Sequence, residues 1–143
     1  MTADQLSGSR WRFVFSAWLI ALTGTLGALF LSEVMGLIPC ELCWYQRVFM
    51  FPLVLILAVG LASSDVRVFG YALPLALAGE VVALYHTLLY QGLIPTPLQP
   101  CGPGPSCAEI NLNLFGFISI PLLSLTAFTA IVLLLLVKKG TSK

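Results

Sequence analysis

The sequence predicts an all-α membrane protein: a bundle of four transmembrane helices with both termini in the cytoplasm and two cysteine-bearing segments on the outer side. The chain has 143 residues, of which 59% are hydrophobic and only 9% are charged. It contains four runs of about 17 to 24 residues with few or no charges, a length that crosses the hydrocarbon core as a helix. Because these runs occupy most of the chain, we expect one domain over 1–143 and no separate soluble domain.

The order of the spans follows from the apolar runs, which predict helices at 13–34, 41–62, 68–90 and 114–137. The first run is longer than the apolar part of a signal peptide, about 7 to 15 residues, so we interpret it as a membrane helix. The segment 91–113 is rich in proline and glycine, which disfavours a helix or a central strand. We expect this segment to be an irregular outer arm that reaches across the bundle.

The basic residues predict the orientation of the bundle. They lie at the two ends of the chain and between the second and third spans: Arg10, Arg12, Arg67, Lys138, Lys139 and Lys143. The positive-inside rule places these segments in the cytoplasm. The cysteine pairs, Cys40 with Cys43 and Cys101 with Cys107, then lie on the outer side, where an oxidising compartment is expected. The net charge of +1 gives no indication of nucleic-acid binding.

The stretch PCELCWYQR, residues 39–47, carries the first cysteine pair and an arginine. Pro39 suits the first position of a helix, so Cys40 is expected in the first turn, where unpaired N–H groups and the helix dipole favour a thiolate. The spacing i, i+3, i+7 puts Cys40, Cys43 and Arg47 on one helix face. We therefore expect Arg47 to point at the cysteines and to stabilise a Cys43 thiolate. The alternative is that Arg47 snorkels to the membrane interface.

The four cysteines alone leave three interpretations open. A CxxC can be a redox pair, half of a zinc site or a structural disulfide, and Cys101 and Cys107 could complete four zinc ligands. We expect no metal, because four-cysteine sites usually come as two close knuckles and five residues separate the second pair. Two inert disulfides would add little to a bundle already held together by its spans.

Two polar side chains fall at similar depth below the first cysteine pair. At 1.5 Å per residue, His86 lies about 6 Å from the outer end of its helix and Arg47 about 10 Å from the start of its own. They outline a place for a flat, apolar molecule with carbonyl ends, although a lone histidine can also be a packing residue. Glu80 lies about 9 Å further inward than His86. It is either neutral and hydrogen-bonded to a neighbouring helix or a proton relay.

Taken together, these motifs resemble the DsbB/BdbC family of disulfide bond formation proteins over nearly the whole chain. The matching stretches are PCELCWYQR, Met50-Phe51-Pro52, Tyr85-His86, the Pro-Cys pair at Cys101 and Gly116-Phe117-Ile118-Ser119-Ile120-Pro121. The resemblance implies a thiol oxidase of the bacterial cytoplasmic membrane, with its cysteines on the periplasmic or outer face. It also implies a quinone cofactor, ubiquinone or menaquinone, which would lie near Arg47, Cys43 and His86. The implied partner is a thioredoxin-like, DsbA-type oxidase.

The resemblance further implies a role for each cysteine. Cys101 would form the mixed disulfide with the partner, Cys107 would exchange with Cys40, and Cys43 would face the quinone. Arg47 would stabilise the Cys43 thiolate and the developing charge on the quinol oxygen. The short spacing of Cys101 and Cys107 matches the shorter BdbC-like members, so the order of exchange is less defined than in longer-looped relatives.

Two other functions remain as alternatives from the sequence. A four-span chain with one intramembrane carboxylate, Glu80, could be a small proton-coupled transporter, but this leaves the cysteines and Arg47 unexplained. The same redox scaffold could also run as a reductase, because the direction of electron flow depends on reduction potentials.

Overall fold

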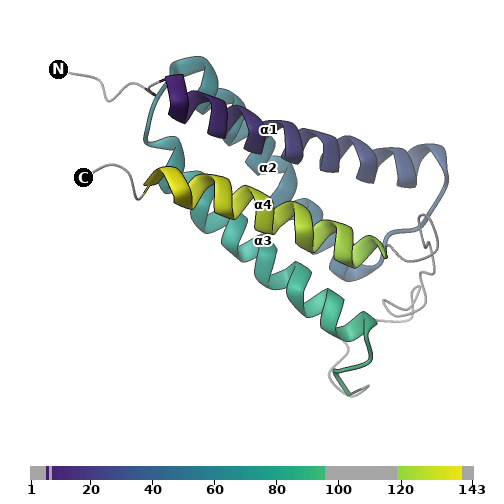
Figure 1. The fold of residues 1–143 in the computed structure, drawn as a ribbon. Helices are drawn as coiled ribbons and strands as arrows, with labels where there is room; N and C mark the ends of the chain where they lie inside the picture. Colours follow the sequence, from purple (N-terminus) through teal and green to yellow (C-terminus); the bar gives the residue numbers. More distant parts are fainter. Residues whose placement is uncertain (1–5, 7, 96–118, 140–143) are drawn as a thin grey trace.

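The protein forms a bundle of four helices (Figure 1) in a computed structural model that describes residues 6, 8–95 and 119–139. The helices are α1 (Gly8–Leu29), α2 (Glu41–Ser63), α3 (Val68–Tyr90) and α4 (Ile120–Lys139), and α1 continues into a π-helical turn, η1 (Phe30–Val34). Over these residues there is no strand. The predicted all-α bundle of four helices is therefore confirmed.

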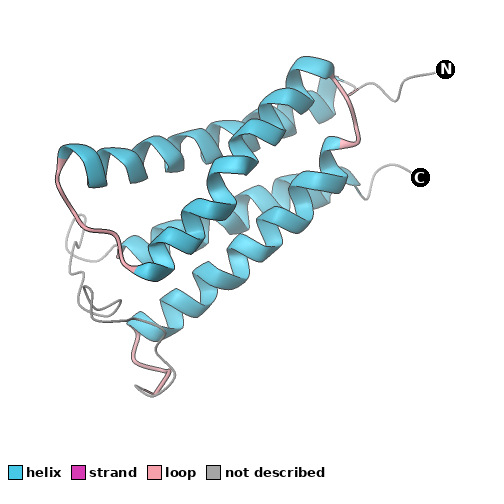
Figure 2. Cartoon of the chain, turned by 180° about the vertical axis from the view of Figure 1, so that it is seen from behind, coloured by secondary structure: helices cyan, strands magenta, loops and turns pink. Residues whose placement is uncertain are grey.

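The helices form a closed ring in which each one packs against two neighbours. α1 contacts α2 and α4, and α3 contacts the same two helices from the other side. Successive helices run in opposite directions, so the first turn of α1, the last turn of α4 and the α2–α3 connection share one end of the bundle (Figures 1 and 2). The Leu6 N–H donates to the Ser64 carbonyl, 2.8 Å away, at this end. The start of α2 and the end of α3 meet at the opposite end.

All four helices are long and apolar enough to cross a membrane. Large apolar side chains remain exposed on the outside of the bundle, including Leu55, Val59, Val81 and Leu133. In water such a surface would be a costly apolar patch, whereas lipid solvates it. The chain is therefore a multi-pass membrane protein.

Two helix starts differ from the ranges that hydropathy predicts. α1 begins at Gly8, ahead of the expected 13–34, because the helix continues through the polar segment that contains Arg10 and Arg12. Backbone hydrogen bonding does not stop where the apolar run stops, so hydropathy underestimates this helix. α4 is described from Ile120, and the expected helical residues 114–118 lie outside the described part of the chain.

Small residues let the helices approach closely. A side chain at Gly79 of α3 would overlap the ring of Phe128 on α4, which is fully buried. Gly60 of α2 faces Val68 of α3 in the same way. Close contact through glycine is typical of membrane helices, because lipid provides no hydrophobic driving force and packing must hold them together.

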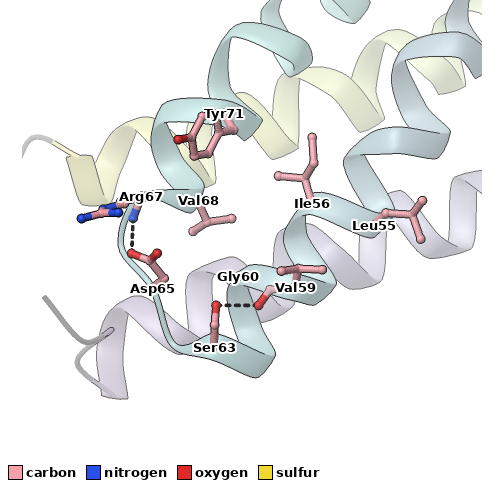
Figure 3. A pocket seen from close by; sticks show the side chains of 9 residues that line it. All are labelled: Leu55, Ile56, Val59, Gly60, Ser63, Asp65, Arg67, Val68 and Tyr71. Carbon is pink, nitrogen blue, oxygen red and sulfur yellow. Dashed lines mark hydrogen bonds between the residues drawn. The ribbon is translucent and has the colours of Figure 1, made fainter. Parts of the chain in front are cut away.

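A hollow of about 430 Å³ lies between α2 and α3 near their connecting turn (Figure 3). At its polar edge the Arg67 N–H donates to the Asp65 carboxylate, 2.9 Å away. The turn also contains Ser64 in the left-handed region at φ 52°, where its N–H bonds the carbonyls that end α2. The hollow is at the end of the bundle away from Cys40 and Cys43. Its lining is Leu55, Ile56, Val59, Gly60, Ser63, Asp65, Arg67, Val68 and Tyr71.

The contact of Gly79 with Phe128 can be tested by one methyl group. We expect Gly79→Ala to destabilise the bundle by about 1 to 3 kcal/mol, because the new Cβ overlaps a fully buried ring. Gly70→Ala on the same helix is the control, since a Cβ there meets nothing within 4 Å. Thermal unfolding in detergent measures both. Equal melting temperatures for the two variants would contradict the close contact.

Candidate functional site

Cys40 caps the amino end of α2. Its backbone is extended (φ −69°, ψ 167°), and its sulfur accepts a hydrogen bond from the Cys43 N–H at 3.4 Å. Its carbonyl accepts the first helical bond, from the Trp44 N–H at 3.1 Å. The sulfur thus takes the place that a serine or aspartate oxygen takes at an ordinary helix cap, at the positive end of the helix dipole.

The helix start lies slightly further along the chain than the sequence predicts. Pro39 was expected at the first helical position with Cys40 inside the first turn, whereas the helix begins at Glu41 and Cys40 is the cap residue. The physical reason is that a side-chain acceptor is worth more at the cap, where it satisfies a helical N–H that has no other partner. In the cap position the Cys40 sulfur accepts a hydrogen bond from the Cys43 N–H, and this contact favours the thiolate form that the sequence predicts.

The two sulfurs of the CxxC lie side by side. Their Sγ atoms are 2.8 Å apart, both thiols are free, and Cys40 is buried while Cys43 is half-buried. A disulfide bond is about 2.05 Å long, so small side-chain rotations suffice to join them. The hydrogen bond from the Cys43 thiol is the main cause that lowers the pKa of Cys40 to about 4; contacts with His86 and the Cys43 N–H add to it, and burial opposes it.

His86 of α3 lies directly against Cys40. Its Nε2 atom is 3.8 Å from the Cys40 sulfur, and its side chain is 2% exposed. Leu89, one turn further along α3, packs in the same small cluster as Cys40 and Leu42. The end of α3 therefore covers the start of α2. His86 contacts the capping sulfur of Cys40, whereas the sequence predicts only that His86 lies at a depth similar to that of Arg47.

Two polar residues join this site that the sequence interpretation missed. Gln46 of α2 is buried, and its Nε2 lies 3.1 Å from His86 Nδ1. Ser124 of α4 donates its hydroxyl proton to Gln46 Oε1 at 2.9 Å. A signal for Gln46 was present, because it follows Cys43 by three residues and so shares its helix face. No local pattern marks Ser124.

Arg47 is directed towards α1. Its Nη2 donates to the Ala28 carbonyl at 2.8 Å and its Nη1 donates to the Ser32 hydroxyl at 3.2 Å. Its guanidinium also lies over the Trp44 ring, 5.4 Å from the centroid. A shared helix face therefore does not by itself direct the guanidinium group to a sulfur. The planar guanidinium group of Arg47 instead donates to the two acceptors whose geometry suits it. The half-buried Arg47 ties α2 to the last turns of α1.

Glu80 lies between α3 and α4, well below the cysteines. Its carboxyl is hydrogen-bonded to the Thr129 hydroxyl of α4 at 3.0 Å. Of the two roles that the sequence leaves open for Glu80, the described contact matches a polar tie between neighbouring helices.

Three side chains of types that can bind a metal ion meet at the cysteine end of the bundle. The sulfurs of Cys40 and Cys43 and a ring nitrogen of His86 all lie within 4.8 Å of one another. Two thiolates and one imidazole make a ligand set that zinc accepts. The four-cysteine zinc site weighed from the sequence includes Cys101 and Cys107, which lie outside the described residues, as does most of the predicted arm.

Comparison with known proteins identifies a family. Residues 9–138 match the family model described as "Disulfide bond formation protein DsbB". The chain is 52% identical over 134 residues to a "Probable disulfide formation protein" of Metapseudomonas resinovorans, covering 93% of each chain. It is 42% identical over 128 residues to "Disulfide bond formation protein C" of Bacillus subtilis (strain 168), covering 90% of this chain and 93% of the relative. No solved structure gives a significant match.

The charge on Cys40 can be measured by its thiolate absorbance near 240 nm. The sample is the reduced Cys101→Ser/Cys107→Ser protein, and the same protein with Cys40→Ser supplies the blank. We expect a midpoint near pH 4. We also expect Cys43→Ala to raise it, because that change removes the largest cause of the shift. A midpoint near 8.5, the value of an ordinary thiol, would contradict the cap geometry.

The same shift links the stability of the reduced protein to pH. Because the pKa of Cys40 falls on folding from 9.0 to about 4, its thiolate stabilises the fold fully above pH 9. That contribution declines as the pH falls and is lost as it passes through 4. The melting temperature of the reduced protein should therefore drop on acidification more than that of the Cys40→Ser variant.

Proposed function

Because the chain belongs to the DsbB family of disulfide bond formation proteins, we propose that it is a membrane thiol oxidase: it reoxidises a thioredoxin-like, DsbA-like partner and passes the electrons through Cys40 and Cys43 to a membrane quinone. The observation that carries this proposal is the pair of free sulfurs 2.8 Å apart, with one of them capping a helix. Such a pair can close into a disulfide and reopen without moving the helices.

The loop cysteines would deliver electrons to this pair. Cys101 would form the mixed disulfide with the partner and Cys107 would exchange with Cys40, because exchange requires a thiolate that reaches a disulfide sulfur. The described start of this segment supports the assignment. Ile94, at the start of the second outer segment, packs against the cluster that contains Cys40, so the chain leaves α3 beside the CxxC.

The residues around Cys43 fit a quinone. Cys43 is half-buried, and its neighbours Trp44 and Val48 are exposed on the outside of the bundle, where a lipid-dissolved molecule can approach. An arginine fork has five N–H groups, so the two bonds from Arg47 to α1 leave donors for a carbonyl oxygen. Arg47 and Cys43 would contact the quinone, and His86, which was expected to join them, would act from behind them, because its ring is 2% exposed and faces Cys40. When bound, the quinone accepts two electrons and two protons.

The cysteine end of the bundle would face out of a bacterial cytoplasmic membrane. The basic residues support this orientation, because Arg10, Arg12 and Arg67 all lie at the end away from Cys40. The named relatives are bacterial proteins, and disulfide exchange requires a compartment that is not kept reduced.

The proposal is tested by supplying the purified protein in detergent with a reduced thioredoxin-like protein and a soluble quinone. We expect the quinone to be consumed as the partner is oxidised. Reduction of an oxidised partner at the expense of added quinol would favour the reductase direction. A wild-type protein that reduces no quinone but moves protons through Glu80 would favour the transporter.

Two single variants separate the steps of the electron path. Cys43→Ser should abolish quinone reduction with any reductant, because the path through the CxxC is broken. Cys101→Ser should stop turnover with the protein partner but keep quinone reduction by dithiothreitol, a small dithiol that reaches the CxxC directly. If Cys101→Ser oxidises the partner at the normal rate, the assigned division of labour is wrong.

Two substitutions of Arg47 test the planar shape of its guanidinium group and its positive charge separately. Arg47→Lys keeps the charge and loses the planar fork, so quinone reduction should weaken partially, and Arg47→Met should weaken it much more. Ser32→Ala is the matched control, because it removes one bond between Arg47 and α1 without touching the guanidinium. If Ser32→Ala lowers the rate as far as Arg47→Met, the arginine acts by tying the helices and not by holding the quinone.

A further inference from the structure

A chain of four polar side chains from three helices ends at the Cys40 sulfur. It begins at the Ser124 hydroxyl on α4, which is 2.9 Å from Gln46 Oε1. It continues from Gln46 Nε2 to His86 Nδ1 at 3.1 Å, and from His86 Nε2 to Cys40 Sγ at 3.8 Å. Gln46 is 7% exposed and His86 2% exposed, so these contacts lie inside the bundle.

The direction of each hydrogen bond follows from which end of the Gln46 amide faces each partner, with Oε1 towards Ser124 and Nε2 towards His86. The Ser124 hydroxyl donates to Gln46 Oε1, so the other end of the amide is an NH₂ group, which can only donate. His86 Nδ1 faces this NH₂ and must therefore be the acceptor, without a proton of its own. In the neutral ring the proton is then on Nε2, the nitrogen that faces the Cys40 sulfur.

We propose that Gln46, oriented by Ser124, is a positioning residue that fixes His86 as the Nε2–H tautomer and thereby keeps an N–H donor on the Cys40 sulfur. The assignment gives His86 a definite task, because in this tautomer it donates to the sulfur and does not take a proton from it. Which reaction uses the stabilised thiolate rests on the proposed function. The tautomer itself does not.

Glu41 and Cys43, on the same segment as Cys40, do not replace this donor. The titratable residues around it are Glu41 and Cys43 on its own segment and His86 and Tyr85 on α3. Glu41 is exposed and carries the wrong charge to favour a thiolate. Cys43 donates to the sulfur only while its own thiol is protonated. The His86 donor therefore persists when Cys43 gives up its proton.

The hydrogen bond from Gln46 to His86 matters because the opposite tautomer of His86 would place an acceptor, and not a donor, against the Cys40 sulfur. If His86 carried its proton on Nδ1, a lone pair on Nε2 would face the sulfur and would repel a thiolate. A histidine without a fixed partner can exchange between the two forms. A buried amide, itself held by a third helix, selects one of them, as outer partners do for metal-binding histidines.

The first test is a direct observation of the ring in the unmodified protein. His86 is the only histidine in the chain, so labelling with ¹⁵N-histidine gives the signals of a single imidazole. In the reduced protein we expect a protonated Nε2 and an unprotonated Nδ1. A protonated Nδ1 with an unprotonated Nε2 would overturn the proposal, whatever the activity of the protein.

The second test uses two variants at different distances from the sulfur. Gln46→Leu fills a similar volume without an NH₂ donor, so we expect mixed tautomers in the ¹⁵N spectrum. We also expect the Cys40 thiolate midpoint to rise by about one pH unit, since a hydrogen bond to a charged group has about that strength. Ser124→Ala, which leaves Gln46 in place, should shift both readouts in the same direction by less. Thr126→Ala is its control, because Thr126 lies on the exposed side of α4.

A merely structural role for Gln46 makes a different prediction. If Gln46 only ties α2 to its neighbours, Gln46→Leu lowers the melting temperature but leaves the tautomer and the Cys40 midpoint unchanged, and the proposal is refuted. Should Gln46→Leu fail to fold, the same two readouts on Ser124→Ala decide. Neither measurement requires a quinone or a protein partner. A wild-type protein inactive with quinone would thus refute the proposed function and leave this inference standing.

Discussion

A bilayer offers no water to a buried polar group, and this constraint organises the cysteine end of the bundle. Several polar side chains near this end have an acceptor or donor on another helix. Arg47 bonds to α1, Gln46 bonds to α3 and α4, and Thr129 bonds to Glu80 across α3 and α4. The contacts that satisfy these groups also hold four otherwise featureless apolar helices in one register. These polar contacts act together with the close apolar contacts of Gly79 with Phe128 and of Gly60 with Val68.

The sequence predicts those features of the fold that are set within one helix, such as its length and its start. Four apolar runs of spanning length predict four helices whatever their neighbours are, because the bilayer sets the length. The cysteines of the PCELCWYQR stretch could be assigned to the start of a helix for the same reason, since the proline and the change in hydropathy are local signals. The special character of Cys40 follows from that position. The family resemblance added the roles of cysteines that lie outside the described residues.

The contacts between helices could not be predicted in the same way. Arg47 shares a face with the cysteines, yet its fork turns to Ala28 and Ser32, and nothing within α2 records where the end of α1 lies. Ser124 is one of several hydroxyl residues in the last span, and only its place opposite Gln46 distinguishes it. Gln46 itself could have been noticed, because an amide inside an apolar run requires a partner.

The position of Cys40 as a helix cap has a consequence for electron flow. In the reduced protein its sulfur is a charged acceptor that meets the helix end and His86, whereas in a disulfide the same sulfur is neutral and loses most of that attraction. Every interaction that favours the reduced state over the oxidised state raises the reduction potential of the pair, by about 30 mV for each 1.4 kcal/mol in a two-electron couple. The helix end thus makes the oxidised CxxC a stronger oxidant than an unperturbed disulfide. The interaction that stabilises the start of α2 in the reduced protein therefore also adds to the oxidising strength of the disulfide.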